Sequence, residues 1–138
     1  MNAITSNLLS GLIGSLIGGV IAGFAAIESV KRAEYYRHCA MLKRMLRDIH
    51  HALEAPTGHP AVKLNDKLSE LTQLVDDVMM FATRYRRLRI LYAWHALAVD
   101  DQAKELNMEA TPTEYTTKGT IEGGMLIKSR IAALIAAL

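Results

Sequence analysis

The pattern of hydrophobic and polar positions divides the chain at Glu28. Residues 8–27 carry no charged side chain, and Glu28 has the first ionisable side chain in the sequence. A helix needs about 20 apolar residues to cross the hydrocarbon core of a bilayer. The pattern therefore predicts a glycine-rich transmembrane helix within residues 1–27.

Small residues recur at every fourth position of this segment, and residues four apart share one face of a helix. One row is Gly11, Ser15, Gly19 and Gly23, and a neighbouring row is Gly14, Gly18, Ala22 and Ala26. Helices in lipid associate by close packing, which such small-xxx-small rows permit. The two rows, which we call the small-residue stripe, predict a glycine-zipper contact with a second copy or with another membrane protein.

Two other interpretations of the N-terminal segment stay open. A cleaved signal peptide begins with a positively charged region, which residues 1–7 lack, and its apolar run is shorter than this one. A soluble oligomer that buries the segment would have to offset its glycines, each of which costs about 1 kcal/mol relative to Ala in a helix in water. A retained transmembrane helix fits the sequence better than either.

Two rows of apolar residues with alternating spacings of three and four follow the predicted span, as in a coiled-coil seam. The first row is Tyr35, Cys39, Leu42, Leu46, Ile49 and Leu53, and the second is Leu64, Leu68, Leu71, Val75, Val78, Ala82 and Tyr85. A loop with two prolines and a glycine separates them at residues 55–60. We expect an all-α fold in which the transmembrane helix continues into a long antiparallel helical hairpin over residues 28–101.

The remainder of the chain, residues 102–138, is predicted to be an acidic linker and a short C-terminal amphipathic helix. Gly123 and Gly124 mark the expected start of that helix. Its apolar residues fall on one face, at positions 127, 131, 134, 135 and 138.

Cationic side chains follow the predicted span closely and recur at residues 84–89. The positive-inside rule then predicts an inner (cytoplasmic) membrane protein with its N-terminus outside and its C-terminal part in the cytoplasm. We expect cationic and aromatic side chains to contact anionic lipid at the membrane interface, namely Lys31, Arg32, Arg84, Arg86, Arg87, Arg89, Tyr92 and Trp94. Core packing of residues 90–99 against the first helix is an equal alternative. Nucleic acid is a less simple partner for the arginines, because a bilayer is already implied and the net charge is only +2.

The sequence predicts no metal site and no cofactor. His50 and His51 are adjacent, so on a helix their side chains point about 100° apart and are not expected to chelate one ion. Cys39 is the single cysteine, so it has no internal disulfide partner, and its place in the first apolar row predicts a buried, inert thiol.

Arg89 and His95 have the R-x5-H spacing, which resembles the Arg/His motif of HEPN-type ribonucleases. The resemblance covers seven residues and implies a helical ribonuclease in which these two side chains are catalytic.

The leading functional hypothesis is a non-enzymatic, small single-span membrane protein. It would homo-oligomerise through the small-residue stripe and act as a structural or accessory subunit of a membrane complex, with a partner that the sequence does not identify. The alternative is a membrane-perturbing or pore-forming protein, such as a lysis protein, a defence effector or a phage membrane-penetration protein. The HEPN-like ribonuclease is the second alternative.

Overall fold

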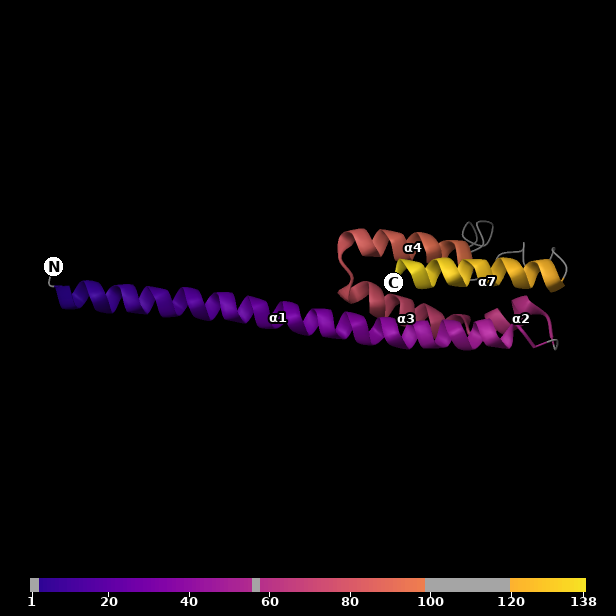
Figure 1. The fold of residues 1–138 in the computed structure, drawn as a ribbon, viewed down its shortest axis with the longest axis horizontal. Helices are drawn as coiled ribbons and strands as arrows, with labels where there is room; N and C mark the ends of the chain where they lie inside the picture. Colours follow the sequence, from indigo (N-terminus) through magenta and orange to yellow (C-terminus); the bar gives the residue numbers. More distant parts are fainter. Residues whose placement is uncertain (1–2, 56–57, 99–119) are drawn as a thin grey trace. The chain divides into compact units, whose positions relative to one another are not determined.

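The computed structural model describes residues 3–55, 58–98 and 120–138 (Figure 1). Every regular element in these ranges is an α-helix, so the all-α prediction is confirmed. The chain forms two compact units, Met1–Glu34 and Tyr35–Leu138. The acidic linker predicted at the start of residues 102–138 falls on residues 99–119, which lie outside the described residues.

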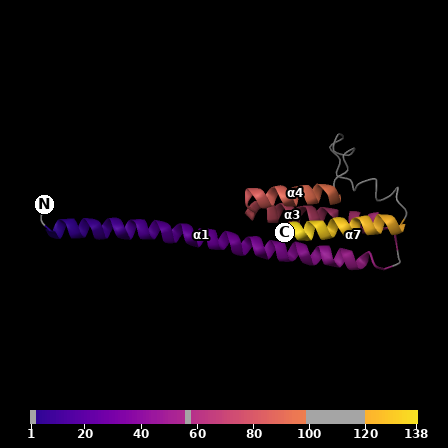
Figure 2. The ribbon, with the colours of Figure 1, turned by 45° about the horizontal axis from the view of Figure 1, so that its top comes forward.

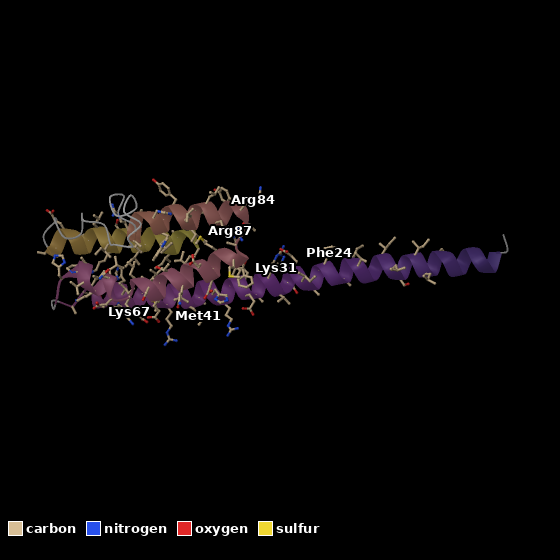
Figure 3. The ribbon with its side chains drawn as sticks, turned by 180° about the vertical axis from the view of Figure 1, so that it is seen from behind. Phe24, Lys31, Met41, Lys67, Arg84 and Arg87 are labelled. Atoms are coloured by element: carbon tan, nitrogen blue, oxygen red, sulfur yellow. The ribbon has the colours of Figure 1, made fainter. Side chains whose placement is uncertain are left out.

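Helix α1, Ala3–Ala52, accounts for the described part of the first unit and continues into the second. The predicted long, uninterrupted N-terminal helix is confirmed. In the first unit its large apolar side chains are exposed from Leu12 to Val30, and Phe24 is 71% exposed (Figure 3). The helix from Ser10 to Ala52 is long and apolar enough to cross a membrane by length and composition, with a mean hydropathy of 1.9 in its most apolar window.

The second unit packs the C-terminal part of α1 with four further helices. These are α2 (Pro60–Asn65), α3 (Leu68–Phe81), α4 (Arg84–Ala98) and α7 (Thr120–Ala137). α3 begins after the C-terminal end of α1, and its last residue, Phe81, stacks on His38 further back along α1 with ring centroids 5.5 Å apart, so the two helices run antiparallel. α4 then reverses again, and α7 returns beside it, so the long helices alternate in direction as in a four-helix bundle (Figure 2).

The core of the bundle consists of one apolar face from each helix. The row of α1 predicted from its spacing is buried from Tyr35 to Ile49, and the row of α2 and α3 is buried from Leu64 to Val78. α4 contributes Ile90, Ala93, Trp94, Leu97 and Ala98, and α7 contributes Ile127, Ile131, Leu134 and Ala137. These side chains form one contiguous cluster.

The returning helix is shorter than the sequence pattern predicted. The second apolar row was expected to continue through Tyr85, but α3 ends at Phe81. Ala82 has extended backbone angles, φ −75° and ψ 145°, and α4 begins two residues later in the opposite direction. Tyr85 therefore lies beyond the chain reversal, where it is exposed.

The last helix begins earlier than the sequence pattern predicted. Gly123 and Gly124 were expected to precede it, yet both lie inside α7 and are buried. A Cβ built on Gly124 would lie 3.5 Å from Cγ of Pro60, so this part of α7 packs closely against α2. Tertiary packing thus offsets the low helix propensity of the two glycines.

Leu46→Ala should destabilise the bundle by about 2–5 kcal/mol, because Leu46 is fully buried and its loss leaves a cavity. Leu88→Ala is the matched control, since Leu88 is 68% exposed, and it should change the free energy of unfolding by less than about 0.5 kcal/mol. Trp94 is the only tryptophan and lies in the core, so its fluorescence during urea unfolding reports both values. Equal losses in the two variants would contradict this core.

Candidate membrane-contacting surfaces

The small-residue stripe on α1 is open in a single copy of the chain. All eight of its residues are exposed. A Cβ built on Gly11, Gly14, Gly18, Gly19 or Gly23 meets no heavy atom within 4 Å. The packing of the described chain therefore does not require glycine at any of these positions.

The hydroxyl groups near the stripe bond within their own helix. Ser15 Oγ donates to the carbonyl oxygen of Leu12 at 2.9 Å, and Ser29 Oγ donates to that of Ala26 at 2.8 Å. Such bonds satisfy the hydroxyl donor without a second helix or water. They leave the surface of the segment predominantly apolar.

Lys31 and Arg32, which the sequence analysis assigned to anionic lipid, are exposed on α1. Arg32 Nε lies 3.3 Å from Oε1 of Glu28, one helical turn earlier. Both side chains are largely in solvent, so this ion pair contributes little to stability. The guanidinium remains accessible to a negatively charged partner.

The predicted arginine cluster lies in the first turns of α4, at the end of the bundle where Tyr35 is found. We call Arg84, Arg86, Arg87 and Arg89 the basic end; Figure 3 labels Arg84 and Arg87. Arg86 Cζ lies 5.0 Å from the centroid of the Tyr35 ring, a cation–π contact. Tyr35 in turn donates its hydroxyl hydrogen to the carbonyl oxygen of Leu138 at 3.0 Å.

Two of the four arginines bind the C-terminal carbonyl groups of other helices. Arg87 donates from Nε to the Met79 carbonyl oxygen at 2.6 Å and from a terminal nitrogen to that of Met80 at 3.2 Å. Arg89 donates to the carbonyl oxygen of Ala136 at 3.1 Å. The last carbonyl groups of a helix lack partners within the helix and carry partial negative charge. These two arginines therefore stabilise the ends of α3 and α7, a structural role that the sequence pattern did not predict.

The two aromatic residues predicted to contact lipid are placed differently. Tyr92 is 83% exposed, which is compatible with that prediction. Trp94 is only 7% exposed and belongs to the core cluster, so the interface assignment of Trp94 is wrong. The residues at positions 90, 93, 94 and 97 form the buried face of α4. This part of the chain therefore packs in the core, as in the alternative to lipid contact given for residues 90–99.

α4 also has an exposed apolar face, which sequence reasoning missed. Tyr85, Leu88 and Tyr92 are exposed and follow the spacing i, i+3 and i+7, so they share one side of the helix. The inward face follows a similar helical spacing. Apolar residues at helical spacing therefore occur on both sides of α4, and their spacing did not distinguish the buried row from the exposed row.

The R-x5-H pair lies on a single helix, with its members separated by about 9 Å along the axis. Arg89 is engaged with the Ala136 carbonyl group, and His95 is half-buried. The structure therefore explains Arg89 by a packing role.

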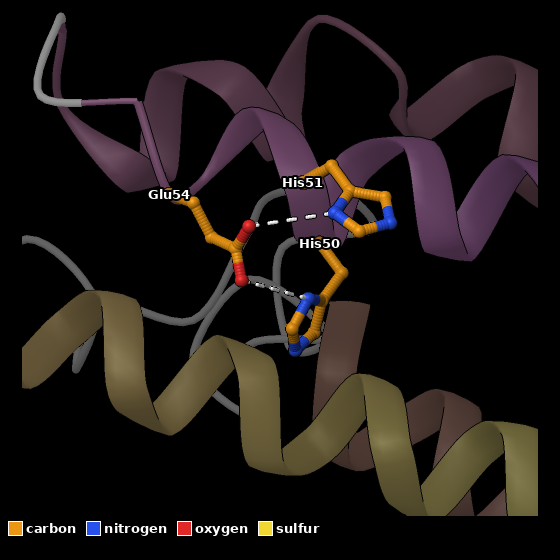
Figure 4. A group of neighbouring side chains, drawn as sticks. All are labelled: His50, His51 and Glu54. Atoms are coloured by element: carbon orange, nitrogen blue, oxygen red, sulfur yellow. Dashed lines mark hydrogen bonds and ion pairs between the residues drawn. The ribbon is translucent and has the colours of Figure 1, made fainter.

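His50, His51 and Glu54 converge at the C-terminal end of α1 (Figure 4). His51 Nδ1 lies 3.4 Å from Glu54 Oε2, and His50 Nδ1 lies 3.9 Å from Oε1. One ligand atom from each of the three residues lies within 4.8 Å of the others, so the expectation that the two histidines diverge too far is wrong. The hydrogen bond with His51 and the charge of Lys128 lower the pKa of Glu54 below its ordinary value.

Comparisons of the chain with protein-family models, with curated proteins and with solved structures gave no match.

Arg87→Ala should lower the free energy of unfolding by about 1 kcal/mol, because two carbonyl groups of α3 lose their donor. Arg87→Lys should restore only part of the loss, since an ammonium group keeps the charge but lacks the planar fork. Arg84→Ala is the matched control and should have little effect, because Arg84 has no hydrogen bond or ion pair to the described residues. Urea unfolding followed by Trp94 fluorescence measures all three. An equal loss for Arg84→Ala would show that general charge, rather than these hydrogen bonds, is responsible.

Stability should fall at alkaline pH because of Cys39. Burial raises the pKa of the Cys39 thiol above its ordinary value of 9.0. The folded state then holds this proton at pH values where the unfolded chain releases it, so unfolding is favoured as pH rises through 9.0 and on to the raised pKa. Urea unfolding at pH 8 and pH 10 should show a smaller alkaline loss in Cys39→Ala than in the parent chain. Identical losses would contradict the burial of this thiol.

Proposed function

We propose that the chain is a small single-span membrane protein that self-associates through the small-residue stripe and acts as a structural or accessory subunit of a membrane complex. The observation that supports this proposal is the exposed, uncharged surface of α1 before Glu28. The proposed setting is the inner (cytoplasmic) membrane, with the bundle on the cytoplasmic side, on the basis of Lys31, Arg32 and the basic residues that follow.

The energetic argument for lipid rests on eight large apolar side chains that are more than half exposed. They are Leu12, Ile13, Leu16, Ile17, Val20, Ile21, Phe24 and Ile27. Burial of one such side chain is worth about 1.5–3 kcal/mol, so their exposure to water forfeits on the order of 10–20 kcal/mol. This is as large as the whole stability of a typical domain, about 5–15 kcal/mol. A bilayer removes that cost without any protein partner.

Lipid by itself does not explain the glycines. Glycine offers no advantage over leucine on a helix face that contacts only lipid. On a face that packs against another helix, the absence of a side chain lets the two backbones approach closely. The stripe has the repeated spacing for such a contact, and its five glycines are open in a single copy. A second copy of α1 is the simplest partner, because it carries the same stripe and forms a symmetric pair.

Close packing of helices accounts for the stripe better than a water-filled pore. The hydroxyl of Ser15 donates within its own helix, and the rest of the stripe, which consists of glycines and alanines, has no polar side chain. A pore that conducts water or ions needs polar groups along its lining.

The basic end of the bundle is the part of the second unit that we assign to anionic headgroups. Arg84 and Tyr85 lie in the first turn of α4 and are exposed. Tyr92 is also exposed but lies about 10 Å further along the helix axis, away from this end of the bundle. Arg87 and Arg89 keep their structural hydrogen bonds, so Arg84 is the arginine best able to move toward a phosphate. In the first unit, Lys31 and Arg32 follow the uncharged segment directly and are assigned to anionic headgroups separately.

Gly19→Leu with Gly23→Leu should convert oligomers of the detergent-solubilised chain to monomers, because two large side chains prevent close approach along the stripe. Val20→Leu with Phe24→Leu is the matched control on the opposite side of the helix and should leave assembly unchanged. Light scattering coupled to size-exclusion chromatography gives the mass of each form. The same membranes are first extracted with alkaline carbonate, which should leave every variant in the pellet.

The two measurements separate the two parts of the proposal. Release of the parent chain by carbonate would contradict membrane insertion. A retained but monomeric parent chain, or an unchanged oligomer in the double glycine variant, would contradict self-association through the stripe.

A further inference from the structure

We infer that His50, His51 and Glu54 form a binding site for a divalent transition metal, best suited to Zn²⁺, at the C-terminal end of α1. The site is independent of membrane insertion and self-association, because all three residues belong to one short stretch of the bundle. Figure 4 shows each of the two imidazole rings facing a different oxygen of the Glu54 carboxylate. The three ligand atoms already lie within 4.8 Å of one another.

The spacing of the residues explains the convergence. His50 and Glu54 are separated by one turn, so their side chains lie on the same side of the chain. His51 reaches the second carboxylate oxygen, and its ring stands nearly perpendicular to that of His50, at 85°, with centroids 6.1 Å apart. Both rings present Nδ1 to the carboxylate. One carboxylate is thus shared by two imidazoles that an isolated pair of adjacent histidines would direct apart.

The donor set selects the class of metal. Two imidazole nitrogens and one carboxylate suit Zn²⁺ and similar borderline ions, whereas Mg²⁺ and Ca²⁺ prefer oxygen ligands alone. Bonds to Zn²⁺ are about 2.0–2.2 Å long, so neighbouring donors in a tetrahedral site lie about 3.4 Å apart. The donor atoms, which lie within 4.8 Å of one another, must move closer together to reach this distance, and the fourth position of a tetrahedral site would be open to water. His51 is the most exposed of the three side chains, which leaves it free to rotate.

Charges around the site act in both directions. The C-terminal end of a helix carries partial negative charge, which favours a bound cation. Lys128 of α7 opposes binding, because its Nζ lies 3.8 Å from Glu54 Oε1 and competes for the same oxygen. Lys63 Nζ is held by the carbonyl oxygens of Ala52 and Ala55, at 2.7 and 3.1 Å. Lys128 is therefore the cation that a metal would displace.

Zinc titration of the untagged full chain in detergent, followed by calorimetry, tests the site. The parent chain should bind one Zn²⁺ per chain, and Glu54→Gln and His51→Ala should each weaken binding at least tenfold. Lys128→Ala should tighten binding, which a site elsewhere on the chain would not show. His95→Ala is the matched control, because His95 lies on α4 outside the cluster, and it should bind like the parent.

Co²⁺ provides a second readout, since its visible absorption reports coordination by nitrogen and the coordination number. Far-UV circular dichroism confirms that each variant keeps its helices. The inference is overturned if the parent chain shows no stoichiometric binding, or if Glu54→Gln and His51→Ala bind as tightly as the parent.

Discussion

The bundle depends on the burial of one apolar row of α1, from Tyr35 to Ile49, against the other helices. This row contributes to the same continuous core as the inward faces of α3, α4 and α7. Because α1 is a single helix, the position of every residue on this row follows from its register along the helix axis. The remaining helices have to place their own apolar rows against it, and their alternating directions allow this. Only residues 82 and 83 separate α3 from α4.

Cationic side chains from neighbouring helices hold the ends of three of these helices. Lys63 of α2 donates to the last carbonyl group of α1, Arg87 of α4 donates to the end of α3, and Arg89 of α4 donates to the end of α7. Each contact satisfies carbonyl groups that a helix leaves open and places positive charge against its negative end. Part of the positive charge of the chain is therefore explained by the architecture of the bundle and needs no external anion.

The two parts of α1 have different surfaces and therefore suit different surroundings. From Tyr35 onward, one side of the helix is buried and most of its exposed residues are polar or charged, with Tyr36 and Met41 as apolar exceptions, as expected of a bundle helix in water. Before Glu28 the helix is apolar on most sides and uncharged, and no described part of the chain covers it. The first part therefore calls for a partner outside the single chain, and the proposed function assigns lipid to the bulky side and a second copy to the small-residue stripe.

The sequence by itself determined the helical class, the charge-free segment and most of the core rows, because these depend on spacing and composition that are local to each helix. Leu42, Leu71 and Leu134 are buried where the spacing of apolar residues predicted. Tertiary structure alone decided the reversal at Ala82, where no proline or glycine marks a break, and hence the exposure of Tyr85. It also decided that Trp94 enters the core and that Arg87 and Arg89 donate to the C-terminal carbonyl groups of α3 and α7. These outcomes depend on which helix lies next to each side chain. The convergence of His50 and His51 on Glu54 is local by contrast, because the three residues are three and four positions apart and the last turn brings Glu54 back toward both rings.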